Sequence, residues 1–115
     1  MEIKILIHVD QLDRISEMTS NLTNLLNYRT NHPDDHLAVI VVLNGDAIMA
    51  TLMPSFRQRV TAFLHAPDVA FHACNNSLNS HGTNPGQLQS GVEVVEAGVV
   101  DLAIRQDRGF RYIKP

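Results

Sequence analysis

Residues 37–43 read Leu-Ala-Val-Ile-Val-Val-Leu, an uninterrupted apolar run rich in β-branched side chains. A strand with one solvent-facing side alternates apolar and polar residues, whereas this run has no polar position on either face. It therefore predicts the central strand of a parallel sheet that is covered by helices on both sides. The run ends at Asn44-Gly45-Asp46, residue types that favour a turn.

Four further stretches have strand character. Residues 3–9 alternate, so that Ile3, Ile5, Ile7 and Val9 share one face, and Leu6 indicates that the second face is partly covered. Shorter apolar stretches at 68–73, 92–95 and 110–113 predict three more strands.

Helical patterns separate these strands. Apolar residues recur at helical spacing from Leu12 to about Tyr28, and Asp10 is expected to cap this helix. A short helical piece is expected over 47–52, and Pro54 suits the first turn of a second full helix.

Two more helices are expected in the second half of the chain. One is short and covers 75–80; the other covers 97–108, ends near Gly109, and is predicted to bury Val99, Val100, Ala103 and Ile104. Alternation of strands and helices predicts a single three-layer α/β/α domain over residues 1–115, with a mostly parallel five-stranded sheet and right-handed crossovers.

Composition narrows the classes of function. The net charge is −3 and the arginines are scattered, so no nucleic-acid partner is expected. The N-terminus shows no signal-peptide pattern, and no apolar run reaches membrane-spanning length, so we expect a cytoplasmic protein without a membrane segment. The single cysteine cannot form an internal disulfide, which agrees with that location.

Candidate site residues lie at the predicted strand ends. These ends are His8-Val9-Asp10, Asn44-Gly45-Asp46, Cys74-Asn75-Asn76 and Glu96-Ala97-Gly98. The carboxyl ends of parallel strands meet at one edge of the sheet, where ligands bind in many open α/β folds. Polar loops also occur there without any ligand, so the pattern alone leaves both interpretations open.

Cys74 allows a reactive and an inert interpretation. A lone cysteine is most often a small buried hydrophobic side chain. This one precedes a predicted helix, whose free N–H groups and dipole stabilise a thiolate and so lower the pKa of the thiol. No second cysteine is present, so a self-contained dithiol–disulfide cycle is excluded.

Histidines near Cys74 suggest other chemistry more weakly. His72 and Cys74 share one face of a strand, and with His81 they are a possible zinc site, although the spacing matches no paired ligand motif. A Cys-His-Asn arrangement with His8 or His81 is conceivable, but nothing in the spacing specifies it. The glycine-rich motifs of dinucleotide and P-loop sites are absent, so binding of a dinucleotide or of a P-loop nucleotide lacks support.

The chain resembles the DsrE/DsrF-like family of small sulfur-metabolism proteins. The matching segments are residues 3–9, Leu43-Asn44-Gly45, Phe71-His72-Ala73-Cys74-Asn75-Asn76-Ser77-Leu78, residues 91–102, Arg105-Gln106 and Tyr112-Ile113-Lys114-Pro115. The resemblance implies a parallel sheet between helices, no organic cofactor, and a homo-oligomer that is a trimer or a hexamer of stacked trimers. It also implies that Cys74 corresponds to the cysteine that carries persulfide sulfur in active members.

Two functional hypotheses follow. In the first, the protein is a sulfur carrier or sulfurtransferase-like protein in which Cys74 bears a persulfide and passes its sulfur to a partner thiol. The N–H groups of Asn75 and Asn76 stabilise the negative charge, while Asn44 and Gly45, with Asp10 nearby, shape the crevice. In the second, the protein is a non-catalytic oligomeric binding module, with a small-ligand crevice and an inert Cys74.

Overall fold

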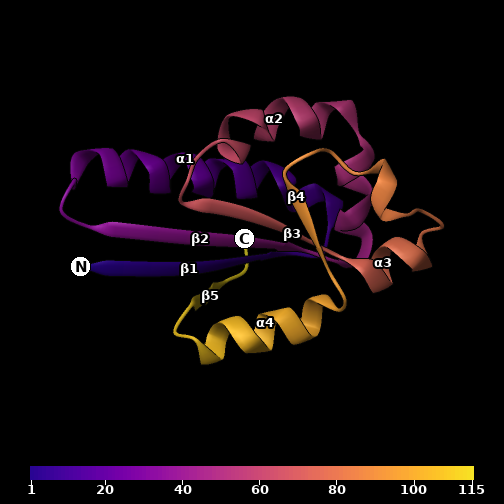
Figure 1. Ribbon diagram of the computed structural model, residues 1–115. Helices are drawn as coiled ribbons and strands as arrows, with labels where there is room; N and C mark the ends of the chain where they lie inside the picture. The colour runs from indigo at the N-terminus through magenta and orange to yellow at the C-terminus, as the bar shows by residue number, and fades with distance from the viewer.

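The computed structural model describes residues 1–115 and contains one five-stranded sheet in which all neighbouring strands are parallel. The strands are β1 (Glu2–Val9), β2 (His36–Leu43), β3 (Val69–Cys74), β4 (Val92–Val95) and β5 (Arg111–Ile113). Their order across the sheet is β4-β3-β2-β1-β5 (Figure 1). The predicted three-layer fold is confirmed, and the sheet is parallel throughout.

Helices cover the two faces of the sheet unequally. α1 (Ile15–Asn31) and α2 (Pro54–Leu64) lie on one face, whereas α4 (Gly98–Asp107) lies alone on the other, and α3 (Asn75–Ser80) follows β3 at the carboxyl edge (Figure 1). Three 3-10 segments complete the chain: η1 (Leu12–Arg14), η2 (Gly45–Leu52) and η3 (Pro85–Gln87). No helix combines the length and apolarity that a membrane crossing requires.

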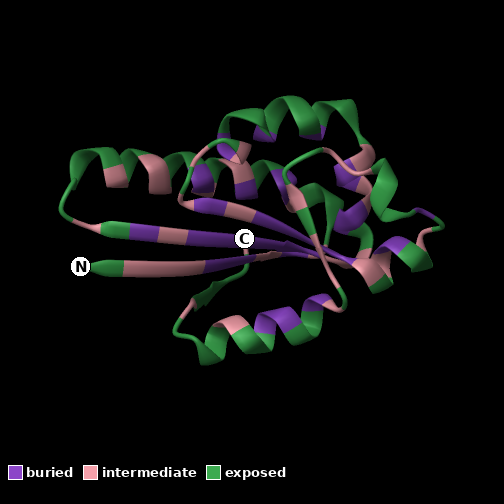
Figure 2. Cartoon of the chain, in the orientation of Figure 1, coloured by how far each residue is buried: buried purple, intermediate pink, exposed green.

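The apolar core is likewise larger on one face of the sheet than on the other. Nineteen buried residues form the core between the sheet and the α1/α2 layer, whereas the α4 side holds a cluster of only four. Those four are Leu6, Ile40, Val42 and Leu102. Strand β2 contributes to both clusters, so its continuous apolar run is buried on both faces as predicted (Figure 2).

The prediction that Asp10 caps the first helix is wrong. The 3-10 turn η1 intervenes between Asp10 and α1, and the N-cap position of α1 belongs to Arg14, which makes no side-chain capping bond. The carboxylate of Asp10 instead pairs with Lys114, whose Nζ lies 3.0 Å from Oδ1. The C-terminal segment beyond β5 therefore supplies the partner of this carboxylate.

The expected orientation of the last helix is also wrong. Val99, Val100 and Ile104 point outward, with 70%, 54% and 42% of their surface exposed, and Ala103 is exposed as well. The inward positions of α4 are Gly98, Asp101 and Leu102. The side of the sheet that α4 covers carries a buried histidine, His72, which hydrogen-bonds to Asp101 and so draws a charged residue inward.

Candidate functional site

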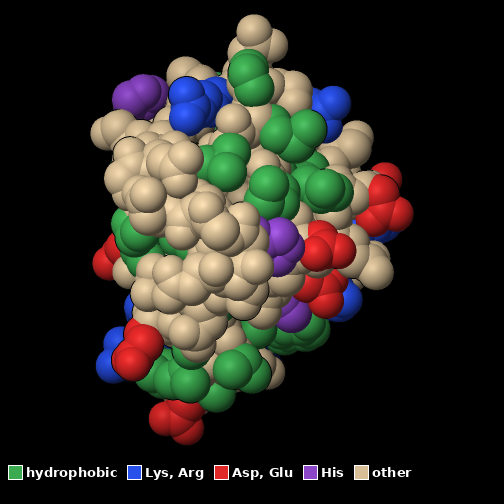
Figure 3. All heavy atoms as spheres, turned by 90° about the vertical axis from the view of Figure 1, so that its right-hand side faces the viewer, with side chains coloured by type: hydrophobic (Ala, Val, Ile, Leu, Met, Phe, Trp, Pro, Cys, Tyr) green, Lys and Arg blue, Asp and Glu red, His purple; other side chains and the backbone are tan.

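The site lies at the carboxyl edge of the sheet. The first three strands end at Val9, Leu43 and Cys74, and β4 ends beside β3 at Val95. Figure 3 faces the side of the molecule toward which these strands run; uncharged polar groups and backbone occupy much of it, and hydrophobic groups gather above and below. The predicted strand-end residues therefore share one region of the surface.

Cys74 is the last residue of β3 and the N-cap of α3. Its backbone is extended, with φ −73° and ψ 119°, so the chain turns directly from the strand into the helix. The Sγ atom accepts a hydrogen bond from the N–H of Ser77 at 3.4 Å. The residue is buried, with 5% of its surface exposed.

Ser77 links the thiol to the end of β2. Its hydroxyl accepts the N–H of Gly45 at 2.9 Å, and it lowers the pKa of the Cys74 thiol as a hydrogen-bond donor to the charged form. Gly45 has a φ of +56°, and a Cβ there would lie 3.1 Å from the carbonyl oxygen of Asp10. A residue with a side chain would therefore be strained at this turn and crowded against the end of β1.

Gly98 brings a second helix to the same sulfur. It is the first residue of α4, and its backbone N–H lies near enough to the sulfur of Cys74 to lower the pKa of the thiol. A Cβ on Gly98 would lie 3.2 Å from Cβ of Asn44 and 3.3 Å from Cβ of Cys74. Because these contacts are tighter than most Cβ atoms tolerate, the close approach of α4 to the thiol depends on glycine at this position.

The backbone N–H groups of Asn76, Ser77 and Gly98 form what we term the amide cluster, and they determine the acidity of the thiol. Burial raises the pKa of Cys74, whereas the Ser77 hydroxyl and the amide cluster lower it by hydrogen bonding to the sulfur. The hydrogen bonds outweigh burial, so the pKa lies below its ordinary value. A larger fraction of the thiol is then present as the nucleophilic thiolate at neutral pH.

The side chain of Asn44 is held by residues of β1 and β5. Its Oδ1 accepts from Nε2 of His8 at 2.8 Å, and Nδ1 of His8 accepts from the hydroxyl of Tyr112 at 2.6 Å. With its oxygen engaged, Asn44 turns its amide nitrogen toward Gly98, where a Cβ would lie 3.3 Å from it. Strand β5 therefore helps to set the position of a side chain beside the thiol.

The histidines do not assemble a metal site. Nδ1 of His72 donates to Oδ2 of Asp101 at 2.7 Å, and Nε2 lies 3.3 Å from a carboxylate oxygen of Glu93. His81 bonds to the carbonyl of Ser77 and to Asp46, and these interactions, the first being the larger, raise the pKa of its imidazole. No group of three or more His, Cys, Asp or Glu side chains is arranged to hold a metal ion.

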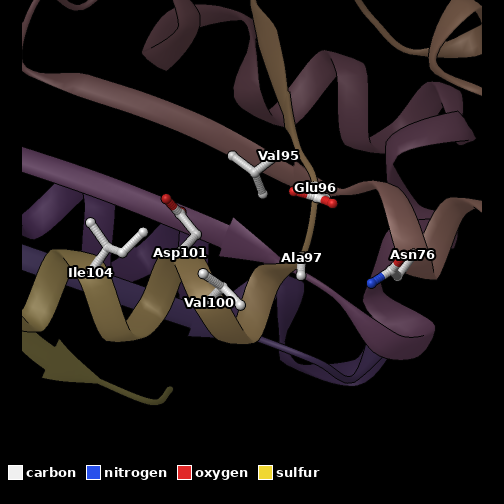
Figure 4. Close-up of a pocket in the computed structure, with 7 residues that line it drawn as sticks. All are labelled: Asn76, Val95, Glu96, Ala97, Val100, Asp101 and Ile104. Carbon is white, nitrogen blue, oxygen red and sulfur yellow. The ribbon is translucent and has the colours of Figure 1, made fainter.

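A pocket of about 370 Å³ lies next to the amide cluster on the α4 side of the sheet (Figure 4). It is lined by Asn76, Val95, Glu96, Ala97, Val100, Asp101 and Ile104. Asn76 belongs to the amide cluster, and Ala97 directly precedes Gly98, which belongs to it as well. The pocket therefore adjoins two of the three residues of the cluster.

Some of the predicted site residues lie at the thiol, and others do not. Cys74, Asn44 and Gly45 lie together, and Asn76 contributes its backbone N–H, as expected. The N–H of Asn75 is not among the groups that reach the sulfur. Asp10 contacts Gly45 through its backbone, but its carboxylate is engaged with Lys114.

The sequence did not predict a role at the thiol for two residues, Ser77 and Gly98, although Gly98 was named within a predicted strand end. Ser77 stands three residues after an N-cap cysteine, which is the spacing at which a helix N–H returns to the capping side chain. That spacing is a usable signal. The contact of Gly98 with Cys74 joins two distant parts of the chain, and its only signal is a glycine at the start of a helix after a strand end.

Comparison with known proteins places the fold among solved structures. No family model matches the chain, and no curated protein matches it. The chain is similar to the protein of unknown function MTH1491 from Methanobacterium thermoautotrophicum, with 26% identity and a TM-score of 0.79 over 99% of this chain and 98% of that one. It is also similar to the conserved protein of unknown function BT1422 from Bacteroides thetaiotaomicron, with 12% identity and a TM-score of 0.76 over 97% and 94%. These similarities support the fold and specify no reaction.

Substitution of Ser77 by alanine tests the hydrogen bonding of the thiol. The midpoint of the pH dependence of Cys74 alkylation by iodoacetamide is expected to rise by roughly 0.5–1 pH unit, because a hydrogen bond to the charged form is lost. Ser80→Ala is the matched control, since Ser80 lies in the same helix and bonds to the carbonyl of Asn76. Equal midpoints in the Ser77→Ala variant and the wild type would contradict this assignment.

Proposed function

We propose that the protein is a sulfur carrier or sulfurtransferase-like protein that holds a persulfide on Cys74. The observation that supports this most is the convergence of three backbone N–H groups and one hydroxyl on a single sulfur, which lowers the pKa of the thiol. Such an arrangement favours the thiolate, the form that attacks sulfur. The resemblance of the segment around Cys74 to DsrE/DsrF-like proteins supports the same proposal.

The proposed reaction needs only one thiol on this chain. The Cys74 thiolate attacks the outer sulfur of a donor persulfide, a new S–S bond forms at Cys74, and the donor leaves as a thiolate. An acceptor thiolate then attacks the outer sulfur on Cys74, takes it as a persulfide, and returns Cys74 to the thiolate. Each step exchanges one S–S bond for another, so no external oxidant or reductant is required.

The neighbouring residues have defined roles in this proposal. The amide cluster and the Ser77 hydroxyl stabilise the thiolate when it attacks and when it leaves. Asn44, fixed by His8, and the turn at Gly45 hold the end of β2 against Ser77 and Gly98. The pocket lined by Asn76 and Ala97 adjoins the amide cluster, and we infer that the partner thiol approaches from that side.

A second candidate function is a non-catalytic binding module. The 5% exposure of Cys74 favours it, because a sulfur with so little surface is slow to meet a partner protein. In that case the pocket lined by Val95, Val100 and Ile104 holds a small ligand, and Cys74 serves only to pack the start of α3.

Intact mass spectrometry distinguishes these functions. After incubation with a persulfide donor and removal of the donor, the wild-type chain is expected to gain the mass of one sulfur atom, and a thiol reductant should remove it. Cys74→Ser is expected to gain nothing because it lacks the attacking thiolate. If the wild type gains no sulfur, or if Cys74→Ser gains as much, the carrier proposal is wrong.

We propose, in addition, that the chain forms the homo-oligomer that the resemblance implies, and that the outer face of α4 supplies a two-fold contact between pairs of copies in it. Val99, Val100 and Ile104 form an exposed apolar stripe on this helix, which packs against β1, β2 and β3 on its other side. Glu96 precedes the helix, whereas Arg105 and Arg108 lie at its end. Two copies packed with their helices antiparallel bring these opposite charges together.

Light scattering at micromolar concentration tests this assembly. The wild type is expected to have a mass several times the 12.8 kDa of one chain, and Val100→Asp is expected to shift it toward 12.8 kDa, because a carboxylate would be buried in the interface. Gln58→Asp on the exposed face of α2 serves as the control for added charge. A wild-type protein that remains a single chain contradicts the proposal.

A further inference from the structure

A buried polar pair lies directly behind the thiol. His72 is 3% exposed and Asp101 is 7% exposed, and Nδ1 of His72 donates to Oδ2 of Asp101 at 2.7 Å. Two other charged groups face this pair: Nε of Arg105 lies 3.2 Å from Oδ1 of Asp101, and Glu93 lies 3.3 Å from Nε2 of His72. If one member of the pair lost its partner, a buried polar group would be left without a hydrogen bond, which costs free energy. The geometry of the pair is therefore strongly defined.

The pair connects the two elements that meet at Cys74. His72 precedes Cys74 by two residues on β3, so both side chains point toward α4. Asp101 lies in the first turn of α4, three residues after Gly98, and its N–H bonds to the carbonyl of Ala97 at 3.1 Å. The His72–Asp101 bond therefore runs beside the Gly98–Cys74 contact and joins the same strand to the same helical turn.

Apolar packing alone does little to fix this turn. Leu102 is the one residue of α4 in the four-residue buried cluster on this side of the sheet. Val99, Val100 and Ile104 are exposed and belong to neither buried cluster, and Val100 and Ile104 line the open pocket beside β4. The placement of the first turn of α4 against β3 thus depends on the polar pair more than on the core.

We propose that His72 and Asp101 are positioning residues that hold the first turn of α4 against Cys74 and keep the Gly98 N–H on the sulfur. They act through Gly98 and do not touch the reacting atoms. This inference deepens the proposed function, but it concerns the acidity of the thiol and stands whether or not sulfur is transferred.

The direction of the effect separates positioning from simple electrostatics. The Asp101 carboxylate is negative, so its charge by itself opposes a thiolate nearby, and its removal by itself lowers the thiol pKa. Loss of the Gly98 N–H from the sulfur raises the thiol pKa. The two explanations therefore predict opposite shifts when Asp101 is replaced.

The experiment measures the pH midpoint of Cys74 alkylation by iodoacetamide in full-length variants. Asp101→Ala is expected to raise the midpoint by about one pH unit, which corresponds to roughly a tenfold smaller thiolate fraction at neutral pH. Asp101→Asn keeps an oxygen that accepts from His72 and is expected to remain at or below the wild-type midpoint. Glu93→Gln is the control, since Glu93 contacts the outer nitrogen of His72 and its side chain is 72% exposed.

A midpoint of Asp101→Ala at or below that of the wild type, or a rise of equal size in Asp101→Asn, overturns the proposal. If Asp101→Ala does not fold, Asp101→Ser repeats the comparison with the same criterion, because its short hydroxyl does not span the distance to His72. Exchange of the Gly98 amide hydrogen gives a second readout: it is expected to be faster in Asp101→Ala or Asp101→Ser than in Asp101→Asn, and equal rates count against positioning.

Discussion

The contact between Gly98 and Cys74 is the constraint on which the rest of the site depends. It brings the start of α4 to a sulfur that already caps α3, so N–H groups from two helices reach one atom. Glycine suits this position, because a Cβ would lie 3.2–3.3 Å from Asn44 and Cys74 and would push them apart by a few tenths of an ångström. The hydrogen bonds to the sulfur come from backbone groups and one hydroxyl, so the thiol is made acidic without a cationic side chain.

This contact exists because the sheet is parallel and α4 crosses it alone. Parallel strands deliver the ends of β1, β2 and β3 to one edge, and the crossover from β4 to β5 must start at that edge. Only four buried apolar residues pack between α4 and this side of the sheet, and the buried His72–Asp101 pair adds a polar contact between the helix and β3. The apolar side chains Val99, Val100 and Ile104 of α4 are left exposed, and these are the residues that the proposed self-association would cover.

The sequence predicted the fold more completely than the site. The apolar run at 37–43 and the alternation at 3–9 are local patterns with direct physical causes, and both strands form as expected. The predicted orientation of α4 was wrong because helical periodicity places a charged residue such as Asp101 on the outer face. Asp101 turns inward because it bonds to His72, which is 29 residues away in the chain and so leaves no local pattern. The same limit hid the role of Gly98, since its contact with Cys74 is set by tertiary packing. Ser77 could have been found, because its relation to Cys74 is local.

The central claim is that the amide cluster and Ser77 stabilise Cys74 as a thiolate in the folded protein. Because the chain has one cysteine, labelling with ¹³Cβ-cysteine gives a single resonance whose chemical shift follows the ionisation of that thiol. We predict a titration midpoint below the value of about 8.5 that a free cysteine shows, and a return toward that value in denaturant. A midpoint at or above about 8.5 in the folded protein would mean that burial outweighs the hydrogen bonds and would contradict the account.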